Sequence, residues 1–153
     1  MQVTTTATRS PGDQVALQRG TASVQELRDR CRLLEEGIVY FLETPHGTID
    51  AFNVEMDRLR ELAAGFDRFV VIVDLAQASR PKPELIEHIV KCIGSIGIHW
   101  CAIRPGSRSL MRSVIQFVGA RMTAIRSRLT MHESLEEAHL AAREILAKAA
   151  RAQ

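Results

Sequence analysis

Apolar and polar residues alternate along this chain in two distinct periods. The clearest apolar run is Phe69–Leu75, which is broken only by Asp74 near its end. A continuous apolar run of this length is typical of a strand buried on both faces of a parallel sheet. Pro83 follows eight residues after Leu75, and apolar residues then recur at helical spacing as far as Ile96. Strand, loop and helix in this order predict a crossover between parallel strands, with Pro83 in the first turn of the helix.

The same two periods place the remaining elements. Residues 32–35 and 38–43 predict a β-hairpin with a turn between them. The apolar positions from Val24 to Leu34 by themselves fit either a helix or a strand. Gly65 and Gly97 are expected to end the helices that precede them. Further strands are expected at residues 98–103 and 128–131, and further helices after Thr48 or Asp50, after Ser107 or Ser109, and after Ser134.

The resulting order of elements is β-β-α-β-α-β-α-β-α. This order predicts a single α/β domain with a mixed sheet and helices packed on it. Residues 1–22 are rich in Thr, Ser, Gly and Gln and show neither period, so we expect a mobile N-terminal tail there. The folded domain is expected over residues 23–153. Its leading hairpin leaves a sheet edge that a second copy could pair with, so a homodimer is one expectation.

Composition fits one soluble globular domain, because 46% of the 153 residues are hydrophobic and 25% are charged. The three cysteines, Cys31, Cys92 and Cys101, are odd in number and far apart, which argues against a disulfide framework or a zinc ribbon. We therefore expect free thiols in a reducing cytoplasm. No apolar run reaches the length of a membrane span, and the first residues lack the apolar core of a signal peptide.

The net charge is only +2, but it is unevenly distributed. Residues 102–132 contain six arginines and no acidic residue, whereas residues 33–90 contain eleven acidic and five basic residues. Residues 104–109 combine a loop glycine, hydroxyls and two arginines before an expected helix, all of which favour an anion. They predict a site for a phosphate-bearing ligand or an acidic protein surface; the alternative is a solvated basic face. The residues of this anion site are Arg104, Ser107, Arg108 and Arg112.

Asp74 lies at the carboxyl end of a strand, where parallel sheets build their sites. A role as phosphoryl acceptor or metal ligand would need further acids, and the next strand end offers Arg104. Capping of the loop, or pairing with Arg80 or Arg104, is the alternative. His88 and Cys92 share a helical face but lack a second pair of ligands.

Common catalytic and nucleotide-binding motifs are absent from the sequence. It contains no G-x-G-x-x-G, no Walker lysine loop and no G-x-S-x-G. We therefore expect no enzyme activity, no cofactor and no metal site. An aromatic content of 5% and the small net charge argue against nucleic-acid binding.

The order of elements resembles the STAS domain, the fold of anti-sigma-factor antagonists and of the regulatory tails of sulfate transporters. The resemblance covers about residues 23–148. It is carried by the strand Val70-Val71-Ile72-Val73-Asp74-Leu75 and by the closing segment from Leu129 to Ala138. In that segment a last strand runs into Ser134-Leu135-Glu136-Glu137-Ala138 before the final helix, as is typical of the family.

The resemblance implies a non-catalytic regulatory module that binds a protein partner, either an anti-sigma or kinase-like protein or another signalling protein. In phosphorylated members a partner kinase modifies a serine of an Asp-Ser-Ser-Gly at a helix start. The corresponding positions here are Lys82-Pro83-Glu84-Leu85, so no hydroxyl is present. Glu84 instead gives the helix start a fixed carboxylate, which the helix dipole favours. The implied partner surface comprises Asp74, Ser79, Arg80 and Glu84; the alternative function is binding of a small phosphorylated or anionic ligand at Arg104–Arg112.

Overall fold

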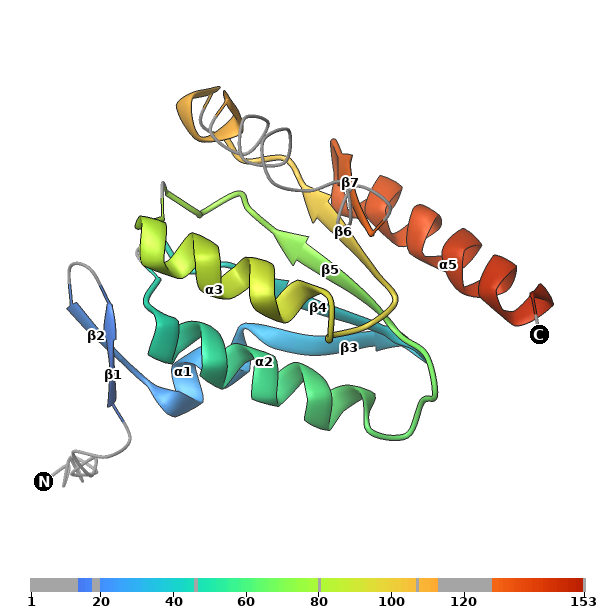
Figure 1. The fold of residues 1–153 in the computed structure, drawn as a ribbon, viewed down its shortest axis with the longest axis horizontal. Coiled ribbons are helices and arrows are strands. Elements are labelled where there is room, and N and C mark those ends of the chain that lie inside the picture. Colours follow the sequence, from blue (N-terminus) through green and yellow to red (C-terminus); the bar gives the residue numbers. More distant parts are fainter. Residues whose placement is uncertain are drawn as a thin grey trace, which may run out of the picture.

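Figure 1 shows the fold in the computed structural model, which describes residues 14–17, 20–45, 47–79, 81–106, 108–112 and 128–152. Within these residues five strands form one sheet, in the order β3-β4-β5-β6-β7. Residues 108–112 are helical. The strands of the sheet are β3 (Cys31–Glu35), β4 (Ile38–Leu42), β5 (Val70–Asp74), β6 (His99–Ile103) and β7 (Leu129–His132), and the longer helices are α2 (Ile49–Ala63), α3 (Pro83–Ile93) and α5 (Leu135–Arg151).

The sheet is mixed, as the sequence predicts. β3 and β4 are antiparallel, whereas β4, β5, β6 and β7 run parallel to one another. Gly37 forms the turn between β3 and β4 with φ 77°, a backbone conformation that glycine adopts at little cost. The parallel strands are in register, so Leu42, Asp74 and Ile103 lie side by side where β4, β5 and β6 end. These findings confirm the predicted α/β class.

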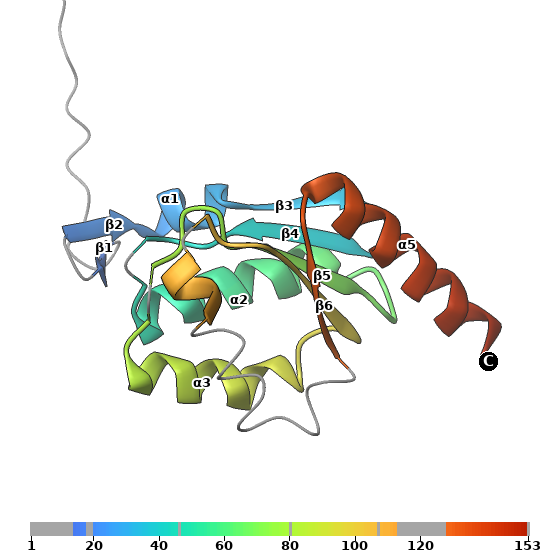
Figure 2. The ribbon, with the colours of Figure 1, turned by 90° about the horizontal axis from the view of Figure 1, so that it is seen from above.

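Both faces of the sheet are covered, because successive residues of each strand point to opposite sides. Helices α2 and α3 lie on one face and α5 lies on the other (Figure 2). On the first face the rings of Phe41 and Trp100 meet edge to face, with centroids 5.8 Å apart. The core on this face also includes Val39, Val71, Val73, Ala102 and, from the helices, Phe52, Met56, Leu59, Leu85 and Ile93.

Helix α5 covers the second face with small residues. Ala138 and Ala142 are its fully buried positions, and they pack over Ile72 of β5 and Cys101 of β6. Small side chains let a helix backbone approach a sheet closely. Near the far end of α5, Leu146 lies against the turn at Gly37, where an added Cβ would come within 3.2 Å of it.

The N-terminal part of the chain differs from the expectation. The ambiguous segment from Val24 to Leu34 is divided: α1 (Val24–Asp29) is helical and β3 begins at Cys31. Within the segment expected to be a mobile tail, β1 (Gln14–Leu17) and β2 (Gly20–Ser23) pair as an antiparallel hairpin. Residues 1–13 lie outside the described part. The start of α1 is fixed by a capping box in which Ser23 and Glu26 each accept a bond from the other's backbone N–H.

The predicted end of α3 is corrected, and the predicted end of α2 is confirmed with a different conformation of its glycine. α3 ends at Ile93 with Gly94 as its C-cap, rather than at Ile96 before Gly97. α2 does stop before Gly65, but Gly65 is not in the left-handed conformation expected of a terminating glycine. Gly97 has φ 71° and packs against the carbonyl oxygen of Phe69, so it forms the entry to β6 instead.

The helix expected after Ser107 or Ser109 is present at residues 108–112, and its expected continuation lies outside the described residues. Among the residues that the structure describes, no helix is long and apolar enough to cross a membrane.

Replacing Gly97 with alanine is expected to destabilise the fold. Its positive φ costs a residue with a Cβ about 1–2 kcal/mol, and the new Cβ would lie 2.9 Å from the Phe69 carbonyl oxygen. We expect Gly97→Ala to lower the free energy of unfolding in urea by roughly 2 kcal/mol or more. Gly65→Ala is the control, because a Cβ added there would meet nothing within 4 Å and the φ of Gly65 is not positive. Equal losses from the two variants would contradict this account.

Candidate functional site

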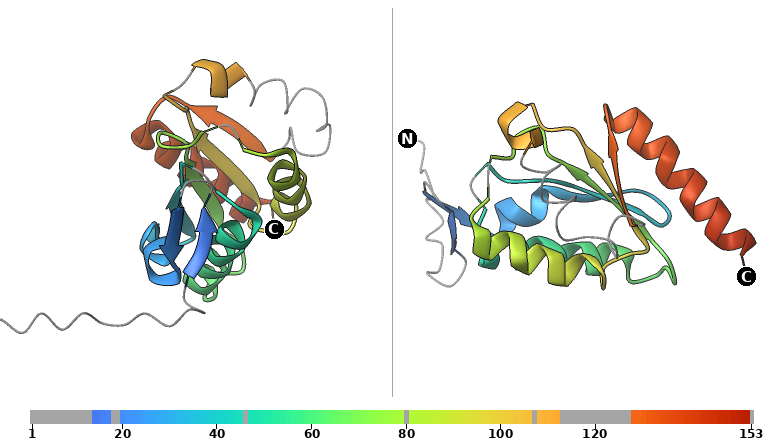
Figure 3. Two further views of the ribbon diagram at one scale, coloured as in Figure 1. Left: turned by 90° about the vertical axis from the view of Figure 1, so that its left-hand side faces the viewer. Right: turned by 45° about the horizontal axis from the view of Figure 1, so that its top comes forward.

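The carboxyl edge of the parallel strands gathers most of the residues that the sequence analysis singled out. Strands β4, β5 and β6 end level with one another, and each leads into a loop on that edge. The left view of Figure 3 looks at the molecule from this side. We call the loop from Leu75 to Lys82, between β5 and α3, the β5–α3 loop.

Asp74 ends β5 and holds the start of the β5–α3 loop. Its Oδ1 accepts a hydrogen bond of 2.9 Å from the backbone N–H of Ala76, and its Oδ2 accepts one of 2.8 Å from the hydroxyl of Tyr40. Burial, and next the hydrogen bond to Asp74, raise the pKa of Tyr40 to about 12, so the phenol stays a donor. The guanidinium of Arg32 covers the Tyr40 ring at 4.7 Å. Asp74 therefore caps its loop, one of the two roles left open by the sequence.

Arg30 ties three segments of this edge together. Its Nε donates to the carbonyl oxygen of Leu42 at 2.9 Å, and one terminal nitrogen donates both to the carbonyl of Glu43 at 3.1 Å and to Oε1 of Gln77 at 2.8 Å. A second tie comes from Ser79, whose hydroxyl donates to the carbonyl oxygen of Pro45. The β5–α3 loop is thus attached to the end of β4 at two points.

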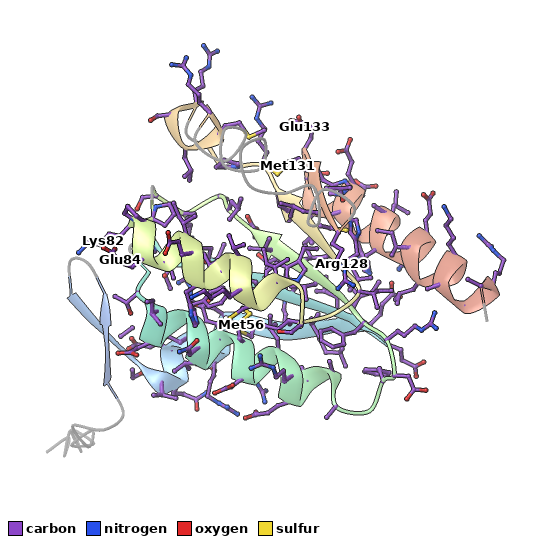
Figure 4. All side chains as sticks on the ribbon, viewed as in Figure 1. Met56, Lys82, Glu84, Arg128, Met131 and Glu133 are labelled. Carbon is purple, nitrogen blue, oxygen red and sulfur yellow. The ribbon has the colours of Figure 1, made fainter. Side chains whose placement is uncertain are left out.

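The other predicted residues of the partner surface follow this loop. Glu84 lies exposed in the first turn of α3, which begins with Pro83 as predicted. Figure 4 shows Glu84 and Lys82 together at that helix start. Arg80 lies outside the described residues, so the predicted pairing of Asp74 with Arg80 is not tested. The other predicted partner of Asp74, Arg104, is paired elsewhere.

The predicted anion site lies on the same edge, after β6. The guanidinium of Arg104 is 3.3 Å from the carboxylate of Glu133 at the end of β7. Gly106 packs close to the carbonyl of Ala76, which places this loop beside the β5–α3 loop. Arg108 and Arg112 are exposed. Ser107 lies outside the described residues. Two exposed candidates for anion contact, Arg108 and Arg112, therefore follow the loop that lies beside the predicted partner surface, while the charge of Arg104 is already offset by Glu133.

The described arginines of the arginine-rich segment do not lie in one continuous patch. Arg128 lies at the start of β7 and Glu133 follows its end, as Figure 4 shows. There Arg128 donates to the carbonyl oxygen of Gly94 at 2.8 Å, at the C-terminus of α3. Cations favour helix C-termini, so this arginine has a structural contact at the opposite edge. Arg121 and Arg126 lie outside the described residues.

Two acids near this edge were not foreseen: Glu55, which is fully buried, and Glu43, which is half-buried. Glu55 of α2 is 0% exposed, and neither carboxyl oxygen has a hydrogen-bond partner among the described residues. Burial, and next the charge of Glu43, raise the pKa of Glu55 to about 10. Burial also raises the pKa of Glu43, although its Oε1 accepts bonds from the N–H and hydroxyl of Thr44. Cys31 lies beside them, and burial raises the pKa of its thiol to about 12.

Three of the histidines, His88, His99 and His132, are engaged in structural contacts. His88 Nε2 is 2.6 Å from Oδ1 of Asn53, a contact that joins α3 to α2. The same nitrogen is 3.6 Å from the sulfur of Cys92 on α3. His99 and His132 each contact the hydroxyl of Thr130, at 2.9 and 2.8 Å. Across the described residues, no group of three or more His, Cys, Asp and Glu side chains could hold a metal ion.

The structure adds three residues to this edge that the sequence analysis did not single out. Tyr40, Arg30 and Gln77 were missed because each acts through a contact across 12 to 47 residues of chain. One signal was available: Glu43-Thr44 ends an apolar strand just as Asp74 does. The spacing of α2 held a signal for Glu55, because this residue lies three positions after Phe52 and four before Leu59, on the apolar stripe. Burial of such a residue depends on how α1 and β3 pack over the helix.

Comparisons with known proteins give no relative: no protein family, no curated protein and no solved structure matches this chain. The STAS resemblance therefore stays a prediction.

The three-way tie made by Arg30 predicts a specific loss of stability. Arg30→Lys keeps the charge but loses the forked donors, leaving two carbonyls and one amide with fewer bonds. We expect it to lower the free energy of unfolding by roughly 1–3 kcal/mol. Arg60→Lys is the matched control, because Arg60 makes an exposed contact with Asp57 one turn away, and a much smaller change is expected. Similar losses in urea denaturation for the two variants would show that the tie is unimportant.

Proposed function

We propose that this chain is a STAS-like, non-catalytic regulatory module that binds a protein partner. The partner would dock on the carboxyl edge of the sheet, over the β5–α3 loop, the start of α3 and the exposed arginines 108 and 112. A serine kinase-like or anti-sigma protein is the kind of partner that the resemblance implies.

One observation carries this proposal: the edge combines a firmly held loop with outward-facing charges. The β5–α3 loop is fixed through Asp74, Gln77 and Ser79. Glu84, Arg108 and Arg112 stand exposed around it. A surface that is ordered before binding loses less conformational entropy on association. Exposed charges of both signs give orientation and selectivity rather than bulk affinity.

The hydrogen bonds of Asp74 support a binding role over a chemical one. Both of its oxygens accept bonds, from Ala76 and Tyr40, and the nearest cation of the β6–β7 edge is paired with Glu133. Among the described residues, Asp74 also belongs to no group of three or more His, Cys, Asp and Glu side chains that could hold a metal ion. In this proposal Asp74 positions the loop that the partner touches.

The proposed regulation does not use the phosphoserine of the family. Position 84 carries a glutamate in the first turn of α3, so negative charge is present there permanently. Ser79 is the loop hydroxyl nearest in sequence, and it is bonded to Pro45. Binding would then be controlled by partner abundance or by a change elsewhere in the chain. We place the module in the cytoplasm, which suits three cysteines that are free and, for Cys31 and Cys101, buried.

A second candidate is binding of a small phosphorylated or anionic ligand at Arg104–Arg112. The exposure of Arg108 and Arg112 favours it. The ion pair between Arg104 and Glu133 weighs against it, because one of the three arginines already has an acidic partner. Inorganic phosphate and a nucleotide therefore serve as competitors in the test of the main proposal.

Affinity capture with the whole chain tests the proposed partner surface. The bait variants are Glu84→Lys and the double change Arg108→Glu with Arg112→Glu. We expect the wild-type chain to retain a stoichiometric protein partner, and each edge variant to bind that partner at least about tenfold more weakly, since reversed charges repel. Isothermal titration with the purified partner gives the affinities.

Glu144→Lys is the matched control, because Glu144 is an exposed glutamate on α5, away from the edge. It should bind the partner as the wild type does. The proposal fails if no protein partner is found, or if the edge variants and the control behave alike. Displacement of the partner by phosphate or nucleotide, together with saturable binding of that anion alone, would favour the second candidate instead.

A further inference from the structure

Glu55 lies in an environment that does not suit a carboxylate ion. Its side chain is completely buried on the inner face of α2, which it shares with the buried residues Ala51, Phe52, Met56 and Leu59. A carboxylate has about four lone-pair positions to satisfy. Neither oxygen of Glu55 receives a hydrogen bond from a described residue. An isolated buried charge of this kind is normally avoided by binding a proton.

The charged groups around Glu55 do not neutralise it. On its own helix, Arg58 directs a terminal nitrogen to Glu61, and its Nε is itself buried without a partner among the described residues. Between α1 and β3, Arg30 lowers the pKa of Glu55, but its donors are bonded to Leu42, Glu43 and Gln77. Arg28, on α1, is paired with Glu61. No described cation is therefore bonded to Glu55.

Of the two remaining neighbours, Cys31 is neutral and Glu43 adds negative potential. Cys31 donates its thiol to the carbonyl oxygens of Leu27 and Glu55 at 3.7 Å, and burial keeps that thiol protonated. Glu43, from the end of β4, accepts two bonds from Thr44. Glu43 is thus equipped to carry a charge, whereas Glu55 is not. If either acid of the pair holds the proton, the missing donors select Glu55.

We propose that Glu55 is a buried proton-binding site that keeps its proton at neutral pH and couples the packing of α2 to pH. Loss of the proton would place a negative charge on Glu55 as well as on Glu43. The only donors to these two carboxyl groups that the structure describes are the N–H and the hydroxyl of Thr44. The repulsion between these charges would be relieved if α2 and the Glu43–Pro45 segment moved apart. That segment also holds Ser79, so the opening would reach the β5–α3 loop. The inference does not depend on the proposed function.

The direction of the pH dependence follows from a raised pKa in the folded state. The folded chain holds the proton from the ordinary glutamate range, near 4.5, up to about 10, whereas the unfolded chain has lost it. Stability from this group is complete below about pH 4.5 and declines as pH rises through that window. Each pH unit inside the window lowers the folding equilibrium constant by up to about tenfold.

Carbon-13 NMR of the Glu side chains in the whole protein tests the proton directly. We expect the carboxyl carbon of Glu55, assigned by its loss in Glu55→Gln, to keep the shift of the protonated acid from pH 5 to pH 8. Titration of that carbon between pH 4 and 5, like an exposed glutamate, would overturn the proposal.

Urea unfolding from pH 5 to pH 9 tests the coupling. Glu55→Gln replaces the neutral acid with a neutral amide of the same shape. We expect the stability of this variant to fall less steeply with pH than that of the wild type. The difference should amount to several fold in the folding equilibrium constant for each pH unit. Glu61→Gln is the control on the same helix. Its arginine partners lower the pKa of Glu61 to about 2, so its effect belongs below pH 5 and the slope above should match the wild type.

Two results of this series would reject the proton site. One is an identical slope for Glu55→Gln and the wild type. The other is a stability that follows the concentration of sodium or potassium at fixed pH and not the pH itself, since the charge of the pair would then be balanced by a metal cation.

Discussion

The in-register parallel pairing of β4, β5 and β6 is the constraint on which the rest of this structure depends. It aligns Leu42, Asp74 and Ile103 at one edge, and so sends three loops to the same place. It also sorts side chains by parity, since Val71 and Val73 face α2 and α3 while Val70 and Ile72 face α5. Asp74 has the parity of Ile72, which is why its carboxylate meets Tyr40 on the α5 side. A shift of one residue would exchange both faces.

The polar edge depends on that apolar frame but serves a different purpose. Arg30, Asp74 and Ser79 satisfy backbone groups that the ends of the strands leave open. They hold the loops at the cost of side-chain freedom. The exposed residues of the edge, Glu84, Arg108 and Arg112, are left available for contacts outside the chain. The fold therefore separates groups that build the edge from groups that a partner could touch.

Glu55 differs from the other buried polar residues because its carboxyl group has no hydrogen-bond partner among the described residues. Each other buried polar residue of the described core, Ser23, Thr44 and His99, has a polar partner, whereas the carboxyl of Glu55 has none in the described residues. An apolar residue of similar size at this position would pack with less cost. A buried ionisable group that the fold tolerates at a cost is a reason to look for a role in regulation.

Much of the fold could be predicted because its strands are long enough to show their period. The runs at residues 69–75 and 98–103 and the hairpin at 32–43 indicated the sheet, and the capping serine at 134 indicated the start of α5. The short elements were harder to predict. α1 has only six residues, and β1 and β2 have four each, so a period cannot develop in them. The end of α3 at Ile93 depended on local capping rather than on pattern, whereas the end of α2 before Gly65 was predicted.

By itself the sequence determined the α/β class, the place of Asp74 at a strand end, and the absence of a hydroxyl at positions 82–85, because these follow from local composition and period. Only the tertiary structure decided what Asp74 binds, that Arg30 joins three segments, that Arg104 is paired with Glu133, and that Glu55 is buried beside Glu43. The physical reason is the same in each case. Hydrogen bonds and burial join residues distant in sequence, and their environment exists only after the helices have packed on the sheet.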